Sequence, residues 1–278
     1  MTIALVGLGL IGGSLAKALK AKTSHRLLGH DLDSAVLEKA GREGSIDGRL
    51  TKAALADCDM LIIALYPKAT LEYLGQNANY LKKGAIVIDC AGVKRGICQA
   101  VQPLAKEHGF IFVGGHPMAG TEFSGYDHSR ANLFEGASMI VTPDEEVPHR
   151  ALASLKEVFL SLGFGNFQVT SPDEHDKMIA FTSQLAHVVS NAYVKSPAAL
   201  RHKGFSAGSY KDMTRVAKLN ELMWSELFLD NGDYLSHEID CLIERLEEYS
   251  QTIKDAKIRK LQTILKEGSD IKIFLNDE

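Results

Sequence analysis

The stretch TIALVGLGLIG at residues 2–12 decides the fold. Its first five residues predict a short buried strand that ends in glycine, and apolar residues at helical spacing follow over 10–20. Gly7 permits the tight turn, Gly9 lets the backbone approach a pyrophosphate, and Gly12 allows close packing of helix on strand. The N–H groups and the dipole of the helix N-terminus would bind the phosphates. A glycine-rich turn without a ligand is the alternative, but the strand before it and the helix after it favour a dinucleotide site.

An acidic residue completes the dinucleotide signature. Asp31 lies 19 residues after Gly12, at the end of the next predicted strand. A carboxylate there accepts hydrogen bonds from the ribose hydroxyls and repels a 2′-phosphate, which favours NAD over NADP. A helix N-cap is the alternative role for Asp31, and Asp33 or Ser34 can fill that role equally well. The residues expected to bind the cofactor are Gly7, Gly9, Leu10, Ile11, Gly12 and Asp31.

Strand-like and helix-like patterns alternate over the first 170 residues. The strand candidates after the first one are residues 27–29, 60–65, 85–88, 110–113, 138–141 and 166–169. A helix pattern covers 34–42, and another over 148–162 separates the last two strands. This rhythm predicts a Rossmann-type α/β domain with a parallel, doubly wound sheet that helices cover on both faces.

Long helical patterns replace this rhythm after Ser171. They cover 173–194, 208–218, 220–228 and 233–266. We therefore expect a dinucleotide-binding Rossmann domain over 1–170 and an all-α substrate and dimerisation domain over 171–278. Long helices with many apolar positions in so short a segment favour a homodimer, because symmetric dimers are the commonest oligomers. A self-contained helical bundle packed on the first domain is the alternative.

The composition excludes several classes of protein. Of 278 residues, 45% are hydrophobic and 24% are charged, and the net charge is −4. Nothing in this balance indicates a nucleic-acid or membrane partner, and the longest apolar run, residues 60–66, is far too short to span a bilayer. The four cysteines form no C-x-x-C pair, and no basic leader follows Met1. We therefore expect a cytoplasmic protein with no signal peptide and no metal site.

A single histidine, His116, lies in the run GGHPMAGTE at residues 114–122, after the apolar segment 110–113. We expect the two glycines to let the backbone turn sharply and Pro117 to stop the strand, which would hold His116 on a stiff turn at the strand end. A histidine at a strand end in a nucleotide-binding sheet is a candidate for proton transfer beside a nicotinamide.

Later helical segments carry polar residues on largely apolar faces. Ser183, Gln184 and His187 are neighbours at helical spacing, and such a patch either binds a ligand or forms an internal network. For His187 alone, a satisfied core histidine is an equally good interpretation. Arg215 lies among apolar residues, where a buried guanidinium would pair with the carboxylate of a ligand or with an internal acid. Trp224, the only tryptophan, is by itself more typical of packing.

With these residues in view, the sequence resembles the prephenate/arogenate dehydrogenases of tyrosine biosynthesis. The matching blocks are GLGLIGGS at 7–14, GHPMAGTE at 115–122, LFEG at 133–136, HDK at 175–177, SQLAH at 183–187 and KDMTR at 211–215. The first block is shared with many dehydrogenases, whereas the second and the last are specific. The resemblance implies NAD-dependent oxidative decarboxylation of prephenate to 4-hydroxyphenylpyruvate, or of arogenate to tyrosine.

The resemblance also implies roles for individual residues. His116 would hydrogen-bond the ring hydroxyl of the substrate and help to remove its proton. Arg215 would hold a substrate carboxylate. The other residues expected to line the substrate pocket are Ser183, Gln184, His187, Thr121, Glu122 and Trp224.

Two positions depart from the family pattern. Gly92 stands where the family usually has a serine, so a backbone N–H, a water or another side chain replaces that hydroxyl, or proton removal rests more on His116 alone. Gln184 stands where a histidine is common, and it keeps hydrogen bonding without titration.

The alternative substrates to prephenate are arogenate and another β-hydroxyacid. The alternative of another class is a non-catalytic NAD-binding sensor, which would not need both His116 and Arg215.

Overall fold

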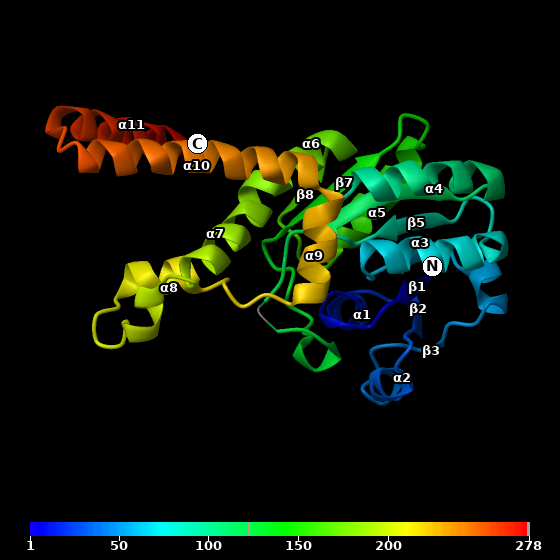
Figure 1. Ribbon diagram of the computed structural model, residues 1–278. Helices are drawn as coiled ribbons and strands as arrows, with labels where there is room; N and C mark the ends of the chain where they lie inside the picture. The colour runs from blue at the N-terminus through cyan, green and yellow to red at the C-terminus, as the bar shows by residue number, and fades with distance from the viewer. Residues whose placement is uncertain (122, 277–278) are drawn as a thin grey trace. The chain divides into compact units, whose positions relative to one another are not determined.

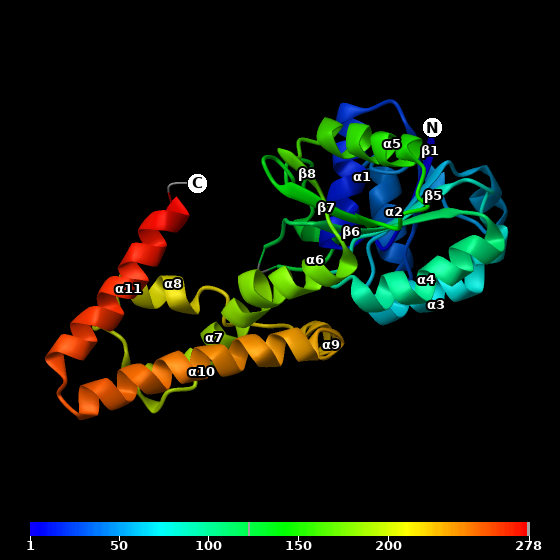
Figure 2. The same ribbon diagram turned by 90° about the horizontal axis from the view of Figure 1, so that it is seen from above.

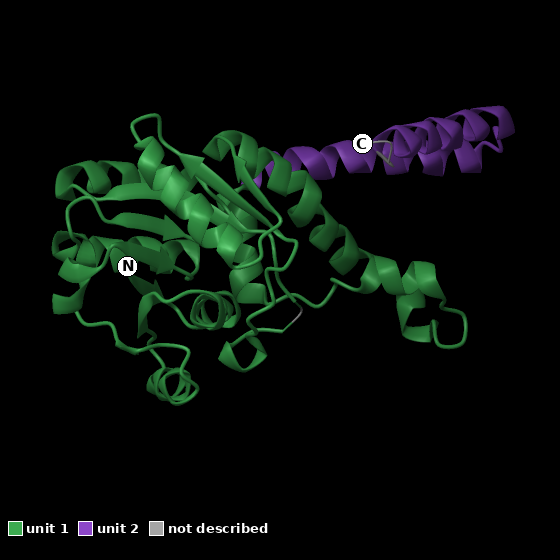
Figure 3. Ribbon diagram, turned by 180° about the vertical axis from the view of Figure 1, so that it is seen from behind, with its two compact units in different colours: residues 1–231 green, residues 232–278 purple. Residues whose placement is uncertain are grey.

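The computed structural model describes residues 1–121 and 123–276 (Figure 1). The chain divides into two compact units, residues 1–231 and residues 232–278 (Figure 3). Within the described residues, no helix combines the length and the apolar character that crossing a membrane requires. The domain boundary expected near residue 170 lies inside the first unit, and it stays a prediction.

The first unit contains an eight-stranded sheet with the order β3-β2-β1-β4-β5-β6-β7-β8. Its strands are β1 (Thr2–Val6), β2 (Arg26–His30), β3 (Gly48–Arg49), β4 (Met60–Ile63), β5 (Ile86–Asp89), β6 (Ile111–Pro117), β7 (Ser138–Pro143) and β8 (Asn166–Val169). The order reverses between β1 and β4. Ligands of such sheets bind at the carboxyl ends of the strands beside this switch point. The expected α/β architecture is confirmed.

The far edge of the sheet differs from the wholly parallel sheet that the sequence predicts. β6 pairs with β7 in an antiparallel sense, and β7 then pairs with β8 in parallel. A parallel connection needs a crossover, usually a helix. Helix α5 (His149–Ser161) supplies it between β7 and β8, whereas the described part of the connection from β6 to β7 contains only the 3₁₀ turn Tyr126–His128.

Helices cover both faces of the sheet, as Figure 2 shows. One hydrophobic cluster joins one face to α1 (Leu10–Lys22), α2 (Ser34–Arg42) and α5, and the other joins the second face to α3 (Pro67–Asn77) and α4 (Arg95–His108). Alternate strand residues serve the two clusters, because successive side chains of a strand point to opposite faces. In β1, for example, Leu5 belongs to the first cluster and Val6 to the second.

Helices make up the rest of the first unit. They are α6 (Pro172–Ile179), the π-helical turn Ala180–Leu185, α7 (Ala186–Tyr193), the 3₁₀ helix Pro197–Arg201, α8 (Gly208–Thr214) and α9 (Glu221–Asp230). The single regular helix expected over 173–194 is therefore interrupted in its middle. A π-helical turn pairs residue i with i+5 and so takes up one residue more than an α-turn.

The second unit consists of α10 (Gly232–Lys254) and α11 (Ile258–Asn276), where the sequence predicts one helix over 233–266. Ala256, at φ 51°, ends α10 in the left-handed conformation. The N–H of Lys257 donates to the Thr252 carbonyl at 3.1 Å, so the last turn closes as a Schellman motif. The break carries neither glycine nor proline, so the sequence gives no local signal for it.

Candidate active site

The glycine-rich stretch forms the turn between β1 and α1 at the switch point. Gly7 has a φ of 82°, and a Cβ atom there would lie 2.5 Å from the carbonyl oxygen of Ala64, which follows β4. A Cβ on Gly12 would lie 1.8 Å from the carbonyl oxygen of Gly7. A Cβ on Gly9 would meet nothing within 4 Å. Packing therefore requires the first and third glycines, and the second leaves open space at the N-terminus of α1 where a pyrophosphate fits.

Asp31 follows β2 and ties the glycine turn to this strand. Its carboxylate accepts hydrogen bonds from the N–H of Leu8 at 2.7 Å and from the N–H of Asp33 at 2.9 Å. Asp33 accepts from the N–H of Ala35 and so caps α2 itself. Each oxygen of Asp31 keeps a second lone pair, which can accept a hydrogen bond from a ribose hydroxyl.

His116 lies inside β6, so the expectation of a turn at Gly114 is wrong. The strand continues to Pro117 because it pairs with β7, which places His116 opposite Ile140. Pairing of β6 with β5 stops at Val113, so the end of β6 has β7 as its sheet partner. Proline is tolerated there because it is the last residue of the strand.

The two glycines of this run serve close packing instead of a turn. A Cβ on Gly114 would lie 2.3 Å from Thr142 Oγ1, and one on Gly115 would lie 2.5 Å from the carbonyl oxygen of Asp89. Under these glycines lies a fully buried ion pair between Lys94 Nζ and Asp89 Oδ2. Lys94 Nζ also donates to the Gly115 carbonyl at 2.6 Å, and the N–H of Gly115 donates to Asp89 at 3.1 Å. The buried pair thus fixes the backbone immediately before His116.

The ring of His116 is the outer member of a hydrogen-bonded chain. His116 Nδ1 lies 2.9 Å from His175 Nε2, and His175 Nδ1 lies 2.7 Å from Asp176 Oδ1. The Asp176 carboxylate also accepts from the N–H groups of Lys94 at 2.7 Å and Arg95 at 2.9 Å, at the start of α4. Burial lowers the pKa of His116 well below its usual value, and burial also lowers the pKa of His175. Both rings are therefore neutral at neutral pH.

The π-helical turn changes the direction in which His187 points. His187 follows His175 by 12 residues. At about 100° per residue, a regular helix would set the two residues about 120° apart. The additional residue in the π-helical turn reduces this difference to about 20°. The turn therefore rotates His187 towards the helix face that carries His175.

His187 is held by its helix and by α9. Its Nδ1 donates to the Ser183 carbonyl at 2.8 Å, so Nε2 keeps its lone pair while the ring is neutral. The ring lies 4.0 Å from that of Trp224, centroid to centroid. Burial, and to a smaller extent the charge of Arg215, lower the pKa of His187. Ser183 thus contributes its carbonyl group to orienting His187.

Arg215 follows the last residue of α8, and its charge acts on His187. Ser190 Oγ donates to the Met213 carbonyl at 2.8 Å, and Asn191 Nδ2 donates to the Ala217 carbonyl at 3.0 Å, which holds this segment on α7. Arg215 is exposed, whereas the sequence suggested partial burial. No carboxylate among the described residues forms an ion pair with it, so its guanidinium is available to an anionic ligand.

Gln184 is buried and takes part in an internal network. Its Nε2 donates to the Leu227 carbonyl at 2.8 Å, and its Oε1 accepts from Asn231 Nδ2 at 2.8 Å. These bonds hold the end of α9. The side chain of Leu227 also limits the space at Gly92, where a Cβ would lie 3.4 Å from Leu227 Cδ2. A direct contact of Gln184 or Gly92 with substrate stays a prediction.

The remaining residues of the expected site belong to the glycine-rich turn and to the run that contains His116. Leu10 and Ile11 form the first turn of α1, with side chains packed on the core. Thr121 is exposed, and its Oγ1 accepts from the N–H of Phe123 at 3.3 Å. Glu122 lies outside the described residues.

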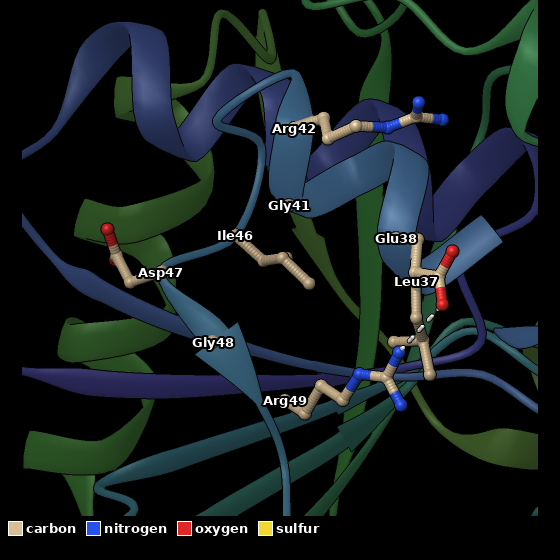
Figure 4. A pocket seen from close by; sticks show the side chains of 8 residues that line it. All are labelled: Leu37, Glu38, Gly41, Arg42, Ile46, Asp47, Gly48 and Arg49. Atoms are coloured by element: carbon tan, nitrogen blue, oxygen red, sulfur yellow. Dashed lines mark hydrogen bonds and ion pairs between the residues drawn. The ribbon is translucent and has the colours of Figure 1, made fainter. Parts of the chain in front are cut away.

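A separate open cleft lies between α2 and β3 (Figure 4). It is lined by the second half of α2 and by the segment that enters β3, and the ion pair between Glu38 and Arg49 crosses it at 3.5 Å. The end of α2 and the residues before β3 lie towards the amino ends of the strands. Ligands of doubly wound sheets bind at the opposite edge, so this cleft is not the cofactor site.

Both halves of the chain match models of one protein family. Residues 15–165 match the nucleotide-binding domain of prephenate dehydrogenase, and residues 171–267 match its dimerization domain. The chain belongs to the prephenate dehydrogenase family. Its 31% identity to a prephenate dehydrogenase of Lactococcus lactis extends over 97% of the chain and 76% of that relative.

Solved structures of the family have the same fold. A prephenate dehydrogenase from A. aeolicus in complex with hydroxyphenyl propionate and NAD+ is 29% identical, with a TM-score of 0.86 over 99% of this chain and 98% of that one. A Synechocystis arogenate dehydrogenase is 28% identical, with a TM-score of 0.82 over 99% of this chain and 100% of that one. Members named for two different substrates thus share this architecture.

His175 and Asp176 contact the candidate site in this member of the prephenate dehydrogenase family, although no sequence motif assigned them a role. Both stand in one of the family blocks. The signal available was a pair of polar residues next to Lys177 at the start of a largely apolar helix. The contact between His175 and His116 joins residues 59 apart in the chain, and no local pattern reports such a contact.

Proposed function

We propose that this chain is an NAD-dependent prephenate dehydrogenase that converts prephenate to 4-hydroxyphenylpyruvate and carbon dioxide. The observation that carries the proposal is the position of His116 at the carboxyl edge of the sheet. Its strand is separated from β1 by β4 and β5. At about 4.8 Å per strand, His116 lies about 14 Å along this edge from the glycine turn. That separation would let the glycine turn hold the phosphates of a dinucleotide while His116 lies within reach of its nicotinamide end.

The residues around the glycine turn fit the cofactor. Gly7, Gly9 and Gly12 would hold the pyrophosphate, and Asp31 would bind the ribose hydroxyls and repel a 2′-phosphate. The open space at Gly9 supports this assignment. The hydride acceptor that the carbinol carbon of the substrate requires would be supplied by NAD held at these residues.

His116 would move the proton of the ring hydroxyl. Its Nδ1 is bonded to His175, which leaves Nε2 for the substrate. The lowered pKa keeps the ring neutral and able to accept. The proton returns to the ring oxygen after the ring carboxylate has left, because the phenol product retains its hydroxyl hydrogen.

Arg215, His187 and Trp224 would form the substrate side of the site. The guanidinium of Arg215 matches a carboxylate in its fork geometry, and prephenate carries two carboxylates. The Nε2 lone pair of His187 can accept a hydrogen bond or, with a proton, donate one. The ring of Trp224 lies against His187 and would form one wall. Contacts of Ser183, Thr121 and Glu122 with substrate are part of the same proposal.

The functional form proposed is a cytoplasmic homodimer. Helices α10 and α11 carry large apolar side chains that are more than half exposed, which supports a second copy of the chain as their partner. They are Leu246, Ile253, Ile258, Leu265, Ile271, Ile273, Phe274 and Leu275. The cysteines are free thiols, in keeping with a reducing compartment.

Steady-state formation of NADH tests the function. Prephenate and arogenate are each supplied with NAD and with NADP, and the expected result is turnover of prephenate with NAD. No turnover of either substrate would refute the proposal, and turnover of arogenate alone would assign the chain to the alternative substrate. A preference for NADP would refute the role of Asp31.

A further inference from the structure

We propose that His175 and Asp176 are positioning residues that hold His116 in the tautomer with hydrogen on Nδ1 and a lone pair on Nε2. The proposal rests on the role of His116 given above, and it assigns a task to two residues outside the expected site.

Asp176 determines which atom donates in each hydrogen bond of the series His116–His175–Asp176. Its side chain is 1% exposed, and its Oδ1 already accepts the N–H of Lys94 while Oδ2 accepts the N–H of Arg95. The guanidinium of Arg95 adds an ion pair at 3.4 Å. These donors and the N-terminus of α4 stabilise a carboxylate, which offers only acceptors. The hydrogen between His175 and Asp176 therefore belongs to His175 Nδ1.

The tautomer of His175 then determines the tautomer of His116. A neutral His175 with hydrogen on Nδ1 has a lone pair on Nε2. That atom lies 2.9 Å from His116 Nδ1, so the hydrogen between the two rings belongs to His116. The remaining nitrogen of His116, Nε2, carries the lone pair that a base needs. Without His175 Nε2 as an acceptor, none of these contacts would favour hydrogen on Nδ1 of His116.

The same contacts can share the positive charge that forms during the reaction. When the ring hydroxyl gives its proton to Nε2, His116 becomes an imidazolium. Its Nδ1 hydrogen can move to His175 Nε2, which places the charge next to the Asp176 carboxylate. The proton retraces this path to the ring oxygen once the carbon–carboxylate bond has broken and its electron pair has made the ring aromatic. No proton is gained or lost by the three residues over the cycle.

Other charged groups around the rings are fixed by their own partners. Lys94 Nζ is bound to Asp89 and to the Gly115 carbonyl, and its charge opposes protonation of both histidines. Asp89 favours protonation of His175 but is already neutralised by Lys94. Asp176 is thus the carboxylate whose hydrogen bond orients the two rings.

Nitrogen-15 NMR of the histidine rings tests the proposal without a need for turnover. In the full chain we expect His116 and His175 both to carry hydrogen on Nδ1. In His175→Leu, which removes the acceptor, His116 should change to hydrogen on Nε2. His187 serves as an internal reference, because its Nδ1 donates to the Ser183 carbonyl and its tautomer should stay the same. Hydrogen on Nε2 of His116 in the unaltered chain would overturn the proposal.

Kinetics of two variants separate positioning from a structural role. His175→Leu should lower kcat by about 10²- to 10⁴-fold, the range seen when a base is held in the wrong tautomer or lost. His175→Gln can still accept from His116 Nδ1 through Oε1, so it should recover at least about tenfold of that loss. Equal kcat values for the two variants would contradict the proposal, as would a loss confined to KM. If His175→Leu does not fold, the proposal is still tested by the tautomer of His116 in the unaltered chain and by the kcat of His175→Gln. Failure of the unaltered chain to turn over prephenate would refute the function but leave the tautomer result intact.

Discussion

Replacing Lys94 with methionine should destabilise the first unit strongly. Methionine keeps most of the side-chain volume but removes the ammonium group, which leaves the Asp89 carboxylate buried without its cation. Breaking a buried ion pair from one side costs about 3–5 kcal/mol. Asp89 retains the N–H donors of Ala91 at 2.9 Å and Gly115 at 3.1 Å, so we expect the lower end, about 3 kcal/mol.

Urea unfolding followed by circular dichroism measures this loss. The matched control is Lys82→Met, since Lys82 forms an ion pair of 2.7 Å with Asp59 at the surface and should matter far less. The double variant Lys94→Met/Asp89→Asn removes the stranded charge and should recover part of the loss, with a coupling of about 2 kcal/mol. If Lys94→Met lowers the free energy of unfolding no more than Lys82→Met does, the buried ion pair does not stabilise the first unit in this way.

Three further predictions concern the substrate clamp, the pH profile and the second unit. Arg215→Ala should mainly raise KM for prephenate, and an unchanged KM would remove Arg215 from the site. On the acid side, kcat/KM should stay high through pH 6.5 and fall only at lower pH, because burial lowers the pKa of His116 and only the neutral ring accepts a proton; an acid limb above pH 6.5 would contradict this. Ala256→Gly should stabilise the chain in thermal unfolding by roughly 0.5 kcal/mol, because glycine adopts a positive φ without strain but loses more chain entropy on folding; a loss of stability would show that the left-handed turn is not strained.

The sheet and the cofactor turn could be predicted because their signals are local. The dinucleotide signature lies within a short stretch of sequence: a strand, three glycines at fixed spacing, and an acid after the next strand. One physical requirement explains each residue type in it. The prediction was wrong where a partner strand decided the outcome. Gly114 and Pro117 are typical of a turn, yet pairing with β7 extends β6 through both. Tertiary pairing overrode local preference there.

The contacts within the candidate site were less predictable, because they join segments that are distant in the sequence. The roles expected of His116 and Arg215 come from their motifs and stay predictions, whereas the bond from His116 to His175 depends on how α6 packs near α4 and β6. The π-helical turn at Ala180–Leu185 has no glycine or proline to mark it, although it sets the direction of His187. The expected contact of Gln184 with substrate stays a prediction, and no local pattern indicated that its amide also holds the end of α9.

The rate of His116→Asn with prephenate and NAD tests directly whether His116 is the base. Asparagine keeps a polar side chain on β6 but cannot take up the proton of the ring hydroxyl. We expect a kcat about 10²- to 10⁴-fold below that of the unaltered chain, with KM for NAD little changed. A near-normal kcat in a folded variant would contradict it, because the base would then lie elsewhere.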